Sequence, residues 1–225
     1  MRLIALTLFN PLKGTEQLKH HPRWIVTFLI LSVFGVVSFA LMHPSLVQST
    51  LQHLPASATN EDKQVVIESL NNELPAKLVF YPVRLFLGWS TFALLLLYIS
   101  KAFGPMEPVR FNQIFSLEVH AEATSVIGQL VTAVITSVSD KGIPISPPFS
   151  LAALGQGQSF VIGSLLTSLN IFTLWYIIVL FTGIHVICRF NKAKSLGIVF
   201  MAWVLTVMFN LGTIQMLRDQ LHLLL

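Results

Sequence analysis

Four ionisable residues close to apolar runs are the best candidates for chemistry in this sequence: Glu118, His120, Glu122 and His185. Glu118 and Glu122 are four residues apart and therefore share a helix face, whereas His120 points elsewhere. Two carboxylates and a histidine at one depth of a membrane could bind a metal ion or relay protons. Their spacing is not the His-Glu-x-x-His pattern that places metal ligands on one helix face. We therefore expect Glu118 and His120 in the aqueous interface and Glu122 capping or bonded locally, with a metal or proton site as the alternative.

A fifth ionisable residue, Arg84, lies two positions after Pro82 at the start of an apolar run. Long basic side chains near helix ends extend their charge to the membrane interface. We expect Arg84 at the outer interface. A salt bridge with Glu122 is not expected, because the two residues lie near opposite faces of a core about 30 Å thick. Polar and small residues inside such runs favour helix packing; those assigned to packing are Asn170, Trp175, Gly183 and Asn210.

The elements that position these residues are predicted to be membrane-spanning helices. Apolar residues make up 54% of the chain and charged residues 11%, against about 25% charged in soluble proteins. A helix needs about 20 mostly apolar residues to cross the bilayer. The sequence predicts five spans, at about 24–42, 78–100, 115–138, 160–188 and 196–216. The predicted fold is an all-α, polytopic membrane helical bundle.

The distribution of Lys and Arg predicts how the bundle is oriented, because short cytosolic loops carry an excess of these residues. With Arg84 set aside, nine lie on the side of the N-terminus and four on the other side. The N-terminus is therefore predicted in the cytosol and the C-terminus outside, which agrees with an odd number of spans.

The spans divide the chain into a cytosolic segment, residues 1–23, and a five-helix membrane domain, residues 24–225. The one long connection is an outer loop, residues 43–77. Within it, Glu61 to Leu70 is predicted to form a short amphipathic helix, which Thr59 or Asn60 could cap.

Several classes of function have no signature in the sequence. Basic residues are spread along the chain and form no stripe of the kind that binds nucleic acid. The one cysteine, Cys188, leaves no disulfide or thiolate metal site within a single chain. A nucleophile with its base and a phosphate-binding glycine loop are also missing. We expect no cofactor, no resident metal and no nucleic-acid partner.

Three segments form a more specific pattern. Asn10–Gly14 and His21–Trp24 precede the first span, and Phe111–Ser116 leads into the third. The most specific part is Ser168–Trp175 with Leu180–Ile184, followed by Arg189 and Ala193. In this order and spacing, the segments resemble the YIP family (Ypt/Rab-interacting-protein-like membrane proteins), and in particular its short bacterial members.

The resemblance implies five helices, a cytosolic N-terminus and a C-terminus on the opposite side. It also implies a bacterial cytoplasmic (inner) membrane. Eukaryotic members are linked to Rab-type GTPases and vesicle traffic, and carry a longer N-terminal region with an Asp-Leu-Tyr-Gly-Pro motif. This chain has only residues 1–23 before its first span and lacks that motif, so Rab-type GTPase binding is not expected.

Three functions follow from these observations. The leading hypothesis is a non-enzymatic membrane scaffold or accessory protein that contacts lipid, other membrane proteins or its own copies. The first alternative is a small transporter or channel that uses the Glu/His cluster. The second is an intramembrane metalloenzyme, which requires a stoichiometric metal.

Overall fold

The computed structural model describes residues 2–52, 54–55, 57–104, 108–138, 149–151, 162, 166 and 168–224, with side chains described as far as 209. These residues are helical almost throughout, apart from an isolated bridge between Ser150 and Asn170. The helices are α1 (Arg2–Phe9), α2 (Pro11–His20), α3 (Ile25–Gln52), α4 (Asn60–Ala102), α5 (Phe111–Ala121), α6 (Ala123–Ser137), α8 (Ile171–Cys188) and α9 (Lys192–Leu224).

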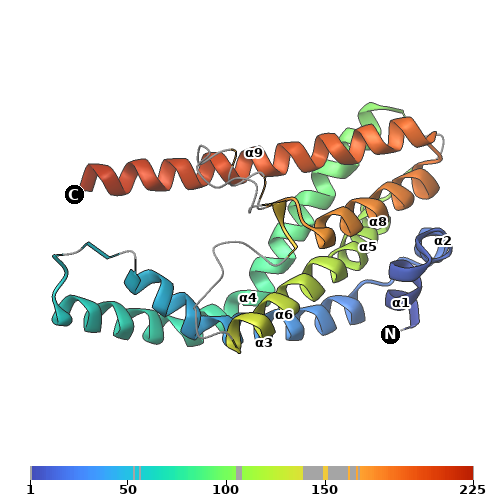
Figure 1. Cartoon of the computed structure of the whole chain (residues 1–225). Coiled ribbons are helices and arrows are strands. Elements are labelled where there is room, and N and C mark those ends of the chain that lie inside the picture. Colours follow the sequence, from blue (N-terminus) through green and yellow to red (C-terminus); the bar gives the residue numbers. More distant parts are fainter. Residues whose placement is uncertain are drawn as a thin grey trace.

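The long helices run along the molecule and form a bundle (Figure 1). Four of them, α3, α4, α8 and the first part of α9, are long and apolar enough to cross a membrane. The helices α5 and α6 follow one another almost without a break, because only Glu122 separates them. The backbone bonds Glu122 N to Glu118 O and Val126 N to Glu122 O, both 2.9 Å, continue the helix through it. The N- and C-termini lie at opposite ends (Figure 1). The predicted all-α membrane bundle is confirmed.

The connection between the first two spans differs from the expected outer loop, residues 43–77. Helix α3 continues through Pro44 to Gln52, and α4 begins at Asn60, so much of the expected loop is helical. His43 Nε2 lies 3.0 Å from Asn71 Oδ1 and ties the two extensions together. The predicted cap is present, because the Thr59 hydroxyl accepts from Asp62 N while the Asp62 carboxylate accepts from Thr59 N. With 43 residues, α4 is about 64 Å long and exceeds the thickness of a bilayer core.

The N-terminal residues form a helical hairpin that packs onto the bundle. Asn10 caps α2 by accepting from Lys13 N, and Pro11 occupies the first turn, where its missing N–H costs nothing. The two helices approach closely at Gly14, where an added Cβ would lie 2.5 Å from the Thr7 Cα. Helix α2 packs mainly on α8, and α1 also contacts α5 and α6. Residues 2–20 are thus an ordered part of the fold.

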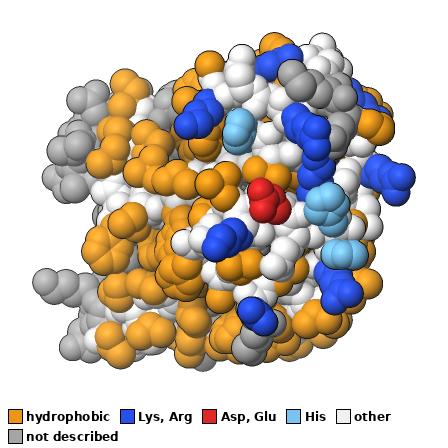
Figure 2. Space-filling view, turned by 90° about the vertical axis from the view of Figure 1, so that its right-hand side faces the viewer, with side chains coloured by type: hydrophobic (Ala, Val, Ile, Leu, Met, Phe, Trp, Pro, Cys, Tyr) orange, Lys and Arg blue, Asp and Glu red, His pale blue; other side chains and the backbone are white. Residues whose placement is uncertain are grey.

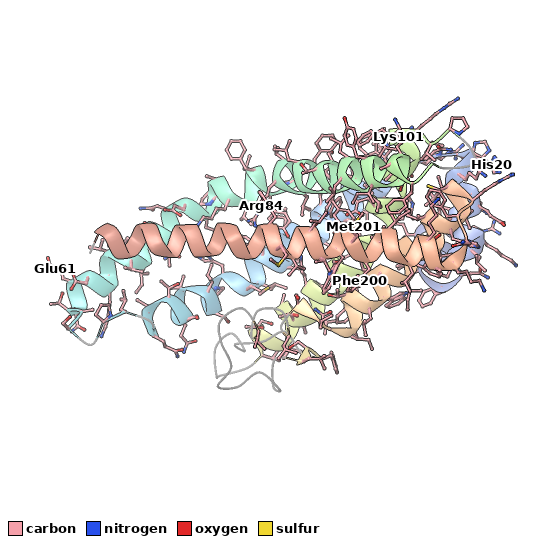
Figure 3. All side chains as sticks on the ribbon, turned by 90° about the horizontal axis from the view of Figure 1, so that it is seen from above. His20, Glu61, Arg84, Lys101, Phe200 and Met201 are labelled. Atoms are coloured by element: carbon pink, nitrogen blue, oxygen red, sulfur yellow. The ribbon has the colours of Figure 1, made fainter. Side chains whose placement is uncertain are left out.

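Aromatic side chains fill the space between α3, α4 and α5. Trp24 meets Phe115 edge to face at 4.9 Å between ring centroids, and Phe28 meets Trp89 at 5.7 Å. Helix α9 lies on α4 and α8 and is the least buried of the four long spans. Its Phe200 and Met201 are exposed (Figure 3). The core therefore holds α5 in the middle of the bundle and leaves α9 at its edge.

Candidate functional site

Glu118 lies in the interior of the bundle, with 1% of its surface exposed. The Tyr176 hydroxyl, on α8, lies 2.9 Å from Oε1 and 3.0 Å from Oε2 of the carboxyl group, to which it donates. A buried carboxyl group is costly unless it is hydrogen-bonded. The contact therefore joins α5 to α8 through a buried polar pair.

His120 joins α5 to a different neighbour, because it points away from Glu118 as its spacing predicts. Its ring is fully buried, with Nδ1 2.8 Å from Ser116 O and Nε2 3.1 Å from the Thr27 hydroxyl on α3. A carbonyl only accepts, so Nδ1 is the donor, and the neutral ring accepts from Thr27 at Nε2. The expectation that Glu118 and His120 lie in the aqueous interface is wrong: helices α3 and α8 cover α5 and exclude water from both side chains.

Glu122 occupies the junction between α5 and α6 and is only partly buried. Its carboxyl group interacts with Ser125 and with Glu118, which agrees with the expected local bonding. One turn further along the same helix, a cavity of about 270 Å³ begins at Ser125. Its walls come from α3, α6 and the start of α8, and include Gln129, Thr132 and Asn170. The polar side chains of this cavity thus begin one turn beyond Glu122, which does not itself belong to the lining.

The structure places His185 and Arg84 away from this cluster. The His185 Nδ1 donates to the Phe190 carbonyl, and the ring stacks on Phe181. It lines a separate cavity at the end of the bundle, with Arg2 and Lys19. Arg84 is exposed on α4, between Glu61 and Lys101 (Figure 3). The acidic pair Glu118 and Glu122 thus lies on one side of α5, His120 faces α3, and His185 belongs to neither contact.

The residues assigned to packing have separate roles. An added Cβ at Gly183 would lie 2.2 Å from Leu117 Cδ1, so α8 approaches α5 closely at this glycine. Trp175 donates from Nε1 to Leu8 O and packs on Phe9, which fixes the N-terminal hairpin. Asn170 caps α8 by accepting from Phe172 N and Thr173 N. The Asn210 side chain lies outside the described residues.

Sequence reasoning missed the two partners that complete the interior site, Tyr176 and Thr27. Both carry a hydroxyl inside an apolar run, which is the one signal that could have found them. Among the described residues, no three His, Cys, Asp or Glu side chains gather as metal ligands. The arrangement can therefore hold helices together through Glu118 and His120.

Comparison with known proteins identifies the family of the chain. The family model described as the Yip1 domain matches residues 5–214. No curated protein and no solved structure shows significant similarity to the chain.

Proposed function

Because the chain belongs to the Yip1 domain family and is an integral membrane protein, we propose that it is a non-enzymatic membrane scaffold or accessory protein. It acts through helix contacts with other membrane proteins or with further copies of itself, and through contacts with lipid. The family leaves the partner open, and a role in membrane trafficking belongs to the same proposal.

One observation carries this proposal: the buried ionisable residues are engaged in contacts between helices. Glu118 is held by Tyr176, and His120 is held by Thr27 and by the Ser116 carbonyl. Their exposed fractions of 1% and 0% leave no surface for a substrate. Buried polar contacts of this kind stabilise helix association in membranes, by about 1 kcal/mol or less each. A protein whose interior polar groups are occupied in this way acts through its outer surface.

The outer surface is tested by photo-crosslinking in native membranes. A photoreactive amino acid at Phe200, which is 56% exposed, should form crosslinks with another membrane protein or a second copy. The neighbouring position Val199 is fully buried and is the matched control, where only crosslinks within the chain are expected. Equal crosslinking to other chains from both positions, or none from Phe200 and from other exposed positions on α3 and α4, would contradict the scaffold role.

A second candidate, a small transporter or channel, is favoured by Glu122 and the cavity that begins one turn beyond it. In liposomes, this function predicts ion or proton flux that Glu122→Gln abolishes. Glu61→Gln, at the exposed start of α4, removes one carboxylate outside the bundle and is the matched control. Folded protein that gives no flux would remove this candidate.

We also propose a bacterial cytoplasmic membrane as the location. Binding of a Rab-type GTPase is not part of the proposal, because the sequence lacks the Asp-Leu-Tyr-Gly-Pro motif. Expression of a tagged chain followed by membrane fractionation tests the location. Recovery in a membrane other than the cytoplasmic one would overturn it.

A further inference from the structure

The end of the bundle that carries α2 holds an open cavity of about 1160 Å³. We call it the basic basin and define it by Arg2, Lys13, Lys19, His20, His185 and Arg189. Residues from α1, α2 and the end of α8 meet there, although they are far apart in the sequence. Figure 2 looks onto this end and shows Lys, Arg and His side chains gathered around very little acid. The basin is therefore a concave surface with an excess of positive charge.

The charge balance of the basin favours an anion. Four Lys or Arg side chains line it, and Glu16 is the one carboxylate in its lining. Like charges that converge on a cavity repel one another, and an anion that binds between them relieves this repulsion. Arg189 adds a second observation: it ends α8 at φ 54°, a left-handed conformation that glycine adopts more easily.

The surroundings of the basin identify the source of the anion as a lipid. Leu6 and Leu12 belong to its lining. Leu12 is 55% exposed, and Phe9, at the turn of the same hairpin, is 79% exposed. A site for a soluble phosphate compound has no use for exposed apolar side chains at its edge, whereas acyl chains would cover them. The Lys and Arg distribution predicts that this end faces the cytosol, where the leaflet supplies anionic lipids.

We propose that the basic basin binds the phosphate headgroup of an anionic phospholipid from the cytosolic leaflet. The cationic side chains pair with the phosphate oxygens, and the acyl chains lie along the exposed apolar side chains of the α1–α2 hairpin. The volume and the number of cations suit a headgroup with two phosphates, such as that of cardiolipin, better than a headgroup with one. This proposal stands on the basin alone and does not depend on the scaffold role.

The test titrates the full chain, purified in a neutral detergent, with cardiolipin, phosphatidylglycerol, phosphatidylcholine or inorganic pyrophosphate. Native mass spectrometry gives the fraction of protein with bound ligand. The wild-type protein should bind cardiolipin most tightly, phosphatidylglycerol less tightly and phosphatidylcholine weakest. Arg2→Gln with Lys13→Gln should weaken cardiolipin binding roughly tenfold or more, since each basic residue near an anionic surface contributes appreciably.

The matched control is Lys101→Gln with Lys192→Gln, which also removes two positive charges from exposed positions at the same end, outside the basin lining. It should leave the affinity for cardiolipin within about twofold of wild type. Equal losses of cardiolipin affinity in both double variants would mean that the lipid is attracted by the general positive charge of this end of the bundle, and would overturn the proposal. Pyrophosphate binding as tight as cardiolipin binding would assign the basin to a soluble anion instead.

A single variant separates binding from folding. Arg189→Gly supplies the residue that the left-handed helix end prefers and should weaken cardiolipin binding. The thermal unfolding temperature of the lipid-free variant is measured beside it, so that a loss of binding can be compared with any change in folding. A variant that binds cardiolipin as tightly as wild type would remove Arg189 from the site. If Arg2→Gln with Lys13→Gln also bound normally, the proposal would be wrong.

Discussion

Glu118 and the cations of the basic basin are both polar features of a mostly apolar protein, but their surroundings differ. The Glu118 carboxyl is 1% exposed and meets the Tyr176 hydroxyl at hydrogen-bond distance. Arg2 and Lys13 are exposed and border an open cavity of about 1160 Å³. A buried polar group that loses its partner pays the full cost of desolvation, whereas an exposed charge keeps its water. Interior polar residues therefore specify how helices pack, whereas the exposed Arg2 and Lys13 side chains can reach a ligand.

The largest effect should come from breaking the interior contact surface at Gly183. In Gly183→Leu, even the first side-chain carbon would lie 2.2 Å from Leu117 Cδ1, so α8 must move away from α5. We expect a loss of about 3 kcal/mol or more in the free energy of unfolding, because the added atoms overpack the interior. Denaturation in mixed detergent micelles measures it. Gly197→Leu is the control, since an added Cβ there meets nothing within 4 Å. Equal losses at both glycines would show that the contact is not tight.

The next largest effect is expected from removing the buried hydrogen bond between Tyr176 on α8 and Glu118 on α5. Tyr176→Phe removes the hydroxyl and leaves the Glu118 carboxyl without this donor, which should lower the free energy of unfolding by about 2 kcal/mol. The contrasting variant is Arg2→Gln with Lys13→Gln, which changes two exposed basin residues. It should stay within about 0.5 kcal/mol of wild type, as surface substitutions usually do. If the basin variant lost more free energy of unfolding than Tyr176→Phe, the basin and not the interior pair would be the more important of the two regions for stability.

A smaller effect is expected where His120 meets α3. Thr27→Val keeps the side-chain shape but removes the hydroxyl that lies 3.1 Å from His120 Nε2. We expect a loss of about 1 kcal/mol in the free energy of unfolding, typical of one buried hydrogen bond. Thr91→Val is the control, because the exposed Thr91 hydroxyl donates to Leu87 O within its own helix. Equal changes in the two variants would mean that the contact between α3 and α5 contributes nothing specific.

The sequence predicted where along the chain the helices lie much better than it predicted which helices contact one another. Hydropathy located the apolar parts of α3, α4, α8 and α9, and the Thr59 cap followed from local residue types. The predicted start of the fourth span at residue 160 was wrong, because Asn170 caps α8 and the helix begins at Ile171; most of residues 160–167 lie outside the described residues. The Tyr176 and Thr27 contacts could not be predicted, because they depend on which faces of α3, α5 and α8 turn towards one another. The extension of α3 past Pro44 was missed because a proline inside a helix usually ends it. The N-terminal hairpin was missed because its apolar run is too short to span, and because its packing depends on contacts with distant residues such as Trp175.

The smallest effect is expected at the exposed cap at the start of α4, which belongs neither to the interior around Glu118 nor to the basic basin. Hydrogen bonds from the Thr59 backbone amide and hydroxyl to the carboxylate lower the pKa of Asp62 below its ordinary value of 3.8. Since the pKa is lower in the folded state, the cap contributes fully above the unfolded value and is lost as the pH falls through the folded one. Hydrogen exchange of the first turn of α4, corrected for the intrinsic rate, should therefore be constant near neutral pH and accelerate below about pH 4. In Asp62→Asn this acceleration should disappear, because the side chain no longer titrates. If the Asn variant kept the same pH dependence, another group would control the end of α4. A local opening that leaves Glu118 and the basin unchanged would show that this cap acts on its own helix alone.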